Sequence, residues 1–289
     1  MRIGIHTSIA GSLEKSALKA AELGANTFQI FSASPRMWKA PVLREEDVRK
    51  MRRARERFNL APLVIHDNYL INLAAADEAL RRRSVAAFRG EIERTLAVGA
   101  EFLVAHPGSA KGLSAEAGVA RVARSLAEAA RGLASQKLTL LLENTAGAGS
   151  SLGSRLEELA EIRRLAQGRL DFEIGFCLDT AHCLAAGYDV ASPAGLRRTL
   201  DQVEAVLRLD RVGVIHANDS KAPLGSRVDR HEHIGRGHIG EAGFRRLLRH
   251  RRLRPKPFIL ETPVDEEGDD RRNIERLKRL CRKSSTTTE

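Results

Sequence analysis

The chain has 289 residues, of which 43% are hydrophobic and 29% are charged, so it can bury a sizeable core beneath a solvated surface. Its 48 Lys and Arg against 37 Asp and Glu give a net charge of +11. This charge favours a polyanionic partner, with nucleic acid ahead of an anionic membrane. The alternative is that the protein comes from a proteome whose surfaces are generally rich in arginine. The chain has three cysteines and no CxxC pair, which argues against a disulfide framework. Neither a secretory signal nor a long apolar run is evident, so we expect a cytoplasmic, nucleoid-associated protein that does not enter a membrane.

Short apolar runs alternate with longer amphipathic stretches along the whole chain. The runs predict eight strands, at 3–6, 27–31, 63–66, 102–106, 138–143, 174–179, 212–216 and 258–261. The stretches between them predict helices at 12–23, 45–58, 78–98, 115–134, 155–166, 194–208, 241–249 and 270–281. Near-continuous apolar strands separated by helices are typical of a parallel sheet buried on both faces. Eight such units predict the α/β class and a (β/α)8 TIM barrel, with a single domain over 1–283 and a disordered polar tail at 284–289.

Seven of the eight predicted strands end on His, Asp or Glu, namely His6, His66, His106, Glu143, Asp179, His216 and Glu261. From His66 onward the intervals are 40, 37, 36, 37 and 45 residues, about one strand and helix each. In a barrel these side chains converge at the C-terminal mouth, where barrel enzymes place their sites. Clustered carboxylates and imidazoles repel or remain costly to desolvate unless a cation holds them together. The spacing therefore predicts a metal site.

Two further clusters enlarge this ligand set. His182 follows Asp179 by three residues, and Asp229 and His231 lie two apart in the stretch after the seventh strand. Nitrogen and oxygen ligands without thiolate suit zinc, with manganese or iron as alternatives. Without His6 the set holds nine ligands, which are too many for one tetrahedral ion, so we expect two or three ions, the arrangement that clamps phosphate esters.

The remaining histidines are expected to have lesser roles. We expect His6 to lie near the site as a hydrogen-bond donor to a ligand, and not to bind metal itself. His233 and His238 lie in a glycine-rich stretch at 234–240 and its border, where we expect solvent exposure ahead of phosphate contact.

These residues, read with their neighbours, closely resemble the endonuclease IV family of apurinic/apyrimidinic endonucleases. The resemblance runs in order through nearly the whole chain. The matching stretches are GIHTS (4–8), FQIF (28–31), HDNYLINL (66–73), HPGS (106–109), LENTAG (142–147), CLDTAH (177–182), AAGYD (185–189), HANDSK (216–221), DRHEHIG (229–235) and LETP (260–263).

The resemblance implies a barrel that holds three zinc ions, with manganese as an alternative in one or more sites. It assigns His66, His106 and Glu143 to the first ion and makes Glu143 the bridge to a second. The ligands that complete the second and third ions are Asp179, His216 and Glu261, and His182, Asp229 and His231, respectively. It also implies hydrolysis 5′ to abasic sites in duplex DNA by a metal-activated water that Glu261 orients. The products are a 3′-hydroxyl and a 5′-deoxyribose phosphate, and blocked 3′ ends are implied as further substrates.

The resemblance implies DNA contacts from loops at the barrel mouth, with Arg36 and Met37 inserted into the duplex and Tyr69 filling the gap. Met37 replaces a polar residue at that position and makes an apolar wedge, and Ala148 stands where the family often has Gln. These departures affect substrate contacts and relative activities, not the reaction class. We expect a monomer.

Two other functions compete with this interpretation. A metal-dependent sugar isomerase or epimerase on a similar barrel typically uses one or two Mn or Mg ions, whereas three zinc ions per chain indicate the nuclease. A catalytically silent DNA-binding protein requires the loss of a ligand, and all nine are present. The residues leave open which metal occupies each site and how strong any exonuclease or oxidised-base activity is.

Overall fold

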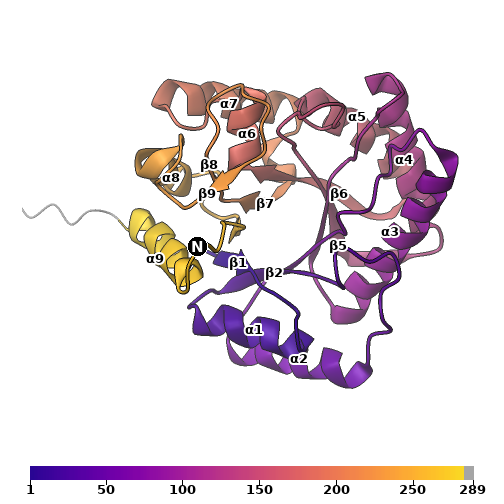
Figure 1. The fold of residues 1–289 in the computed structure, drawn as a ribbon, viewed down its shortest axis with the longest axis horizontal. Coiled ribbons are helices and arrows are strands. Elements are labelled where there is room, and N and C mark those ends of the chain that lie inside the picture. Colours follow the sequence, from indigo (N-terminus) through magenta and orange to yellow (C-terminus); the bar gives the residue numbers. More distant parts are fainter. Residues whose placement is uncertain (283–289) are drawn as a thin grey trace, which may run out of the picture.

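The computed structural model describes residues 1–282, which form a closed barrel of eight parallel strands ringed by helices (Figure 1). The neighbour order around the barrel is β1-β10-β7-β6-β5-β4-β3-β2, and β1 closes it by pairing with both β10 and β2. The strands are β1 (Ile3–His6), β2 (Thr27–Phe31), β3 (Leu63–His66), β4 (Phe102–Ala105), β5 (Ala134–Glu143), β6 (Asp171–Asp179), β7 (Val212–His216) and β10 (Phe258–Leu260). The predicted TIM barrel is confirmed. The tail predicted at 284–289 lies outside the described residues.

Helices follow the strands along the chain and cover the outside of the barrel. They are α1 (Leu13–Glu22), α2 (Glu45–Arg57), α3 (Glu78–Val98), α4 (Ala115–Ala130), α5 (Leu156–Ala166), α7 (Pro193–Val206), α8 (Gly240–Arg249) and α9 (Asp269–Cys281). Several begin at a side chain that caps the first turn: Ser12, Asp77, Ser114 and Ser192 each accept a hydrogen bond from the backbone amide three residues on. Across residues 1–282, none of the helices is long and apolar enough to span a membrane.

The elements differ from the predicted ones at a few boundaries. The helix predicted to run to residue 134 ends at Ala130, because Arg131, with a ψ of 121°, leaves the helical conformation and Gly132 adopts a φ of +75°. β5 already begins at Ala134. β4 and β10 each stop one residue early, so His106 and Glu261 directly follow their strands. The short helix α6 (Thr180–Ala186) and the two-stranded hairpin of β8 (Asp219–Ser220) and β9 (His231–Glu232) are additions that the hydrophobic pattern did not predict.

The core has two parts, one between the strands and the helices and one inside the barrel. The first is a continuous shell of aliphatic and aromatic side chains such as Phe28, Phe88 and Phe244. The second, which we call the apolar layer, is a separate, fully buried cluster of one residue from each of six strands: Val64, Val104, Leu141, Cys177, Val214 and Ile259. Because side chains alternate along a strand, the next inward-facing position on each strand lies two residues further toward the C-terminal mouth.

Candidate metal centre

The ionisable side chains lie at the inward-facing positions next to the apolar layer, on its C-terminal side. Each one follows a residue of the apolar layer by two positions. We call this set the mouth layer: His66, His106, Glu143, Asp179, His216 and Glu261. The alternation of the strands aims all six at the C-terminal end of the barrel, and burial there is nearly complete for most of them. The predicted convergence of the strand ends is therefore present.

A first group of donor atoms comes from three neighbouring strands. His66 Nε2 lies 3.2 Å from Glu143 Oε2, and His106 Nε2 lies 3.5 Å from the same oxygen. The donor atoms of all three residues lie within 4.8 Å of one another, close enough to surround one ion. This is the set expected for the first metal.

A second group shares Glu143 with the first. His216 Nδ1 lies 2.9 Å from Glu143 Oε1 and 3.2 Å from Glu261 Oε2, and Asp179 completes a set whose donor atoms again lie within 4.8 Å of one another. Because the two oxygens of Glu143 face different groups, this carboxylate can bridge two ions. Cys177, in the apolar layer, also approaches Glu143 and His216, but burial raises the pKa of its thiol well above the usual range and keeps it neutral.

A third group depends on the two elements that the hydrophobic pattern missed. Asp179 caps α6 by accepting a hydrogen bond from the backbone amide of His182, and the hairpin brings in His231 on β9. The donor atoms of Asp179, His182 and His231 lie within 4.8 Å of one another. Asp229 lies 3.2 Å from His182 Nε2 and 3.6 Å from His231 Nε2. The expected trio of His182, Asp229 and His231 thus assembles with Asp179 as an additional neighbour.

Hydrogen bonds to backbone carbonyls orient three of the imidazoles. The Nδ1 atoms of His66, His182 and His231 lie 3.0, 2.9 and 3.1 Å from the carbonyl oxygens of Asp67, Asn144 and Glu261, respectively. A carbonyl only accepts, so each Nδ1 donates a proton to it. Each Nε2 is left to face the neighbouring carboxylates, and it is the nitrogen that would bind a metal.

His231 shows most clearly that these groups fit a cation. Its Nε2 is buried without a hydrogen-bond partner, although Asp179 and Asp229 lie 3.6 Å away. An unpaired buried acceptor beside two carboxylates is costly unless a positive charge lies among them. Neutral imidazole nitrogens with carboxylate oxygens and no thiolate are a donor set that suits zinc.

Burial and mutual charge set the protonation of these groups. Burial, with the neighbouring imidazoles of His66 and His182, lowers the pKa of His106 to about 4. Burial also disfavours the charged form of His66, but the hydrogen bond and charge of Glu143 outweigh it and raise that pKa to about 10. For Glu261, burial favours the neutral acid, yet the neighbouring imidazole of His216 leads the effects that lower its pKa to about 2. The carboxylate of Glu261 is thus held ionised.

Two amide side chains that the sequence analysis missed organise the ligands. Asn218 donates to Asp179 Oδ2 at 2.6 Å and to Glu261 Oε2 at 3.2 Å. Gln29, on the one predicted strand that does not end on His, Asp or Glu, contacts both His216 and Glu261. The available signals were a polar residue inside the apolar run of β2 and an amide two residues after His216.

His6 lies beside this network and outside the donor groups described above. Its Nδ1 is 3.0 Å from Gln29 Nε2 and 4.0 Å from Glu261 Oε1, and its ring packs on Phe31. Burial lowers the pKa of His6 to about 4, so the ring is neutral and Nδ1 accepts from the amide. It therefore accepts at Nδ1, where a donor to a ligand was expected.

The expectation for His233 was wrong, whereas His238 is exposed as expected. His233 is only 5% exposed, because its Nδ1 meets the side-chain amide of Asn273 and its Nε2 lies 3.2 Å from Asp265. The adjoining loop is folded inward around Asp219, whose carboxylate accepts from four of its backbone amides, those of Gly235, Gly237, Ile239 and Gly240. Sequence composition alone suggested an open loop.

The residues expected to contact DNA surround the mouth. Arg36 and Met37 are exposed on the loop after β2, and Tyr69, 64% exposed, packs edge-on against Phe31. The side chain of Asn68 donates to the carbonyl of Met37 at 2.7 Å and so ties the two loops together.

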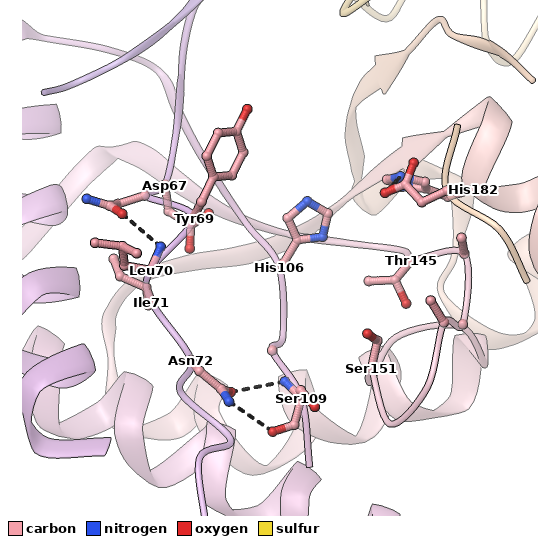
Figure 2. Close-up of a pocket in the computed structure, with 16 residues that line it drawn as sticks. Asp67, Tyr69, Leu70, Ile71, Asn72, His106, Ser109, Thr145, Ser151 and His182 are labelled. Carbon is pink, nitrogen blue, oxygen red and sulfur yellow. Dashed lines mark hydrogen bonds and ion pairs between the residues drawn. The ribbon is translucent and has the colours of Figure 1, made fainter. Parts of the chain in front are cut away.

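A hollow lies between Tyr69, His106 and His182 on one side of the mouth (Figure 2). Asn72 borders it and holds the loop after β4 by hydrogen bonds to the backbone amide and carbonyl of Ser109, at 3.0 and 3.1 Å. A second, larger hollow extends from the same histidines toward Ser34 and Val264. Tyr69 borders both, so a ligand in either hollow meets the donor groups.

Comparison with known proteins places this centre in a family. Residues 17–282 match the family described as "Xylose isomerase-like TIM barrel". The chain is 59% identical over 281 residues to the "Probable endonuclease 4" of Solibacter usitatus, covering 97% of each chain. The chain belongs to the endonuclease IV family. A protein of the same name from Chloroflexus aurantiacus is 42% identical over 284 residues, with 96% of this chain and 98% of that one covered.

Solved structures agree with the endonuclease IV assignment. The crystal structure of endonuclease IV from Thermus thermophilus superposes with a TM-score of 0.85 at 39% identity, covering 97% of this chain and 98% of that one. A D-tagatose 3-epimerase-like protein superposes with a TM-score of 0.70 at 21% identity, covering 97% of each chain. That second likeness concerns the fold alone. Membership of the endonuclease IV family therefore rests on sequence and structure together, and it implies a metal-using nuclease.

Proposed function

We propose that this protein is a zinc-dependent endonuclease of base excision repair that hydrolyses the phosphodiester bond 5′ to abasic sites in duplex DNA. The products are a 3′-hydroxyl and a 5′-deoxyribose phosphate. The observation that carries the proposal is the sharing of Glu143 between two adjoining donor groups, with a third group alongside, in a chain of the endonuclease IV family. Adjoining metal sites suit in-line displacement at phosphorus, because they stabilise the attacking and the leaving oxygens together.

Nine side chains would hold three zinc ions, with manganese as an alternative in one or more positions. The proposed sets are His66, His106 and Glu143; Glu143, Asp179, His216 and Glu261; and His182, Asp229 and His231. When bound, the ions would supply Lewis acidity and a water whose pKa is lowered to about 7.

The protein's own residues position the reactants. Glu261 lies at the rim of the second group with its two oxygens held by Gln29 and Asn218, so it is oriented to accept a hydrogen bond from the attacking water. Glu143, fully buried between the first two groups, fixes their separation. The apolar layer beneath keeps water away from the inner side of the centre, which strengthens the electrostatic interactions above it.

The loops around the mouth select the substrate in this proposal. An abasic nucleotide has already lost its stacking and pairing, so its extrusion from the duplex costs little. Arg36 and Met37 enter the duplex and Tyr69 occupies the space left by the extruded nucleotide; all three are accessible for this purpose. The net charge of +11 supports binding to the phosphate backbone. Hydrolysis at blocked 3′ ends follows from the same chemistry, because they present the same phosphodiester bond.

Incision of a duplex that carries one tetrahydrofuran abasic analogue tests the proposal. We expect nicking 5′ to the analogue, loss of nicking with EDTA or phenanthroline, and recovery on adding zinc. Glu261→Gln is expected to abolish incision while leaving duplex binding largely intact, because the amide cannot replace the carboxylate at the reacting water. Chelator-indifferent incision, or wild-type rates from Glu261→Gln, would contradict the mechanism.

A further inference from the structure

His216 is oriented differently from the three imidazoles that donate to backbone carbonyls. Its Nδ1, and not its Nε2, faces the carboxylates, at 2.9 Å from Glu143 Oε1 and 3.2 Å from Glu261 Oε2. Its Nε2 lies 2.8 Å from the side-chain oxygen of Gln29. At His216, a side chain thus occupies the position that a backbone carbonyl occupies at His66, His182 and His231.

Gln29 reaches this position from across the barrel. It lies on β2, in register with His6 on β1, whereas His216 lies on β7, with β1 and β10 between the two strands. Its side chain is fully buried, and its Nε2 lies 2.6 Å from Glu261 Oε1 and 3.0 Å from His6 Nδ1. Every polar atom of the amide therefore meets a residue of the centre or its immediate neighbour.

These contacts fix the direction of the amide. An ionised carboxylate only accepts hydrogen bonds, so the amide nitrogen of Gln29 must face Glu261, and the amide oxygen must then face His216. A flipped amide would place two acceptors 2.6 Å apart at Glu261. The oxygen in turn requires a proton on His216 Nε2. Nδ1, which is directed at Glu143 and Glu261, is therefore the nitrogen that would bind a metal.

We propose that Gln29 is a positioning residue that sets the ring tautomer of His216 and the orientation of Glu261 for metal binding in the second donor group. This inference rests on the proposed metal chemistry of that group. Partners that fix a ligating imidazole typically change metal affinity by about 10–100-fold when they are removed. β2, which carries no proposed ligand, thus contributes to the centre through the ligands of two other strands.

Zinc binding to three variants of the full chain separates this role from packing. Gln29→Met keeps the shape and removes the amide, Gln29→Ala removes both, and Ile30→Met is the matched control, whose side chain points to the helix-facing side of the same strand. Zinc content by mass spectrometry and competition with a chromophoric chelator are measured for each. We expect one class of zinc to bind about 10–100-fold more weakly in both Gln29 variants and to stay unchanged in Ile30→Met.

A packing role makes a different prediction. If Gln29 acted only through packing, Gln29→Met would bind zinc with wild-type affinity and only Gln29→Ala would bind it more weakly. That result would overturn the proposal.

NMR of the His216 ring nitrogens reports the orientation directly. In the zinc-loaded wild type the signals should show a protonated Nε2, and in Gln29→Met they should no longer show that single state. An unprotonated Nε2 in the wild type would also overturn it. If the wild-type chain binds no zinc, the proposed function fails as well; if it binds zinc and Gln29→Met matches it, only this inference fails.

Discussion

The apolar layer and the mouth layer are built from the same six strands and differ completely in chemistry. Each strand places Val, Leu, Ile or Cys inside the barrel and, two residues later, His, Asp or Glu. At about 3.3 Å per residue the two layers are separated by only about 7 Å.

This proximity shows how the barrel supports a cluster of charges. The apolar layer excludes water from below, so the ionisable side chains above it can exchange hydration only for one another, for amides such as Gln29 and Asn218, or for metal. The apolar layer supplies van der Waals packing, and the mouth layer supplies hydrogen bonds and charge pairs. Substitutions in the two layers should therefore have separable consequences.

The largest effect is expected from Glu143→Gln in the mouth layer. The amide keeps the shape but removes the charge shared by two donor groups, so zinc should be lost from both and incision should fall by about 10²–10³-fold. Single-turnover incision and metal content check this. Glu173→Gln, at the exposed end of the neighbouring strand, is the control and should behave as wild type. Full zinc content in Glu143→Gln would contradict the bridging role.

Leu141→Ala, two residues earlier on the same strand, should have the opposite profile. Removing a fully buried leucine from the apolar layer is expected to lower the free energy of unfolding by about 2–5 kcal/mol, measured by denaturant titration. Zinc stoichiometry and the incision rate at 25 °C should stay close to wild type. If zinc affinity fell as far as in Glu143→Gln, the two layers would not be separable.

The smallest effect is expected outside both layers, at Arg36. Arg36→Ala removes an exposed charge from the loop after β2, so binding of an abasic duplex should weaken and its logarithmic salt dependence should flatten by about one unit. Titrations at several salt concentrations measure both quantities. Metal content and stability should not change. An unaltered salt slope would indicate that Arg36 does not contact phosphate.

The sequence by itself determined the barrel and the position of its mouth layer. Strand periodicity is local, and the repeat of about one strand and helix between His66, His106 and Glu143 could be read without any tertiary information. Once the strands are parallel, alternation forces residues two apart onto the same side, so the convergence of the strand ends follows. Clusters of ligand-type residues outside the strands then added His182, Asp229 and His231, which no strand periodicity marks.

Only the tertiary structure decided how those residues are held. Gln29 reaches His216 across two intervening strands, His233 is buried by Asn273 of α9, and Asp219 folds the loop around itself through backbone amides. Each of these contacts joins segments far apart in the chain through a hydrogen bond, and hydrogen bonding leaves no periodic trace in the sequence. Hydrophobic spacing specifies which way a side chain points, whereas its partner depends on the closed barrel that brings distant strands together.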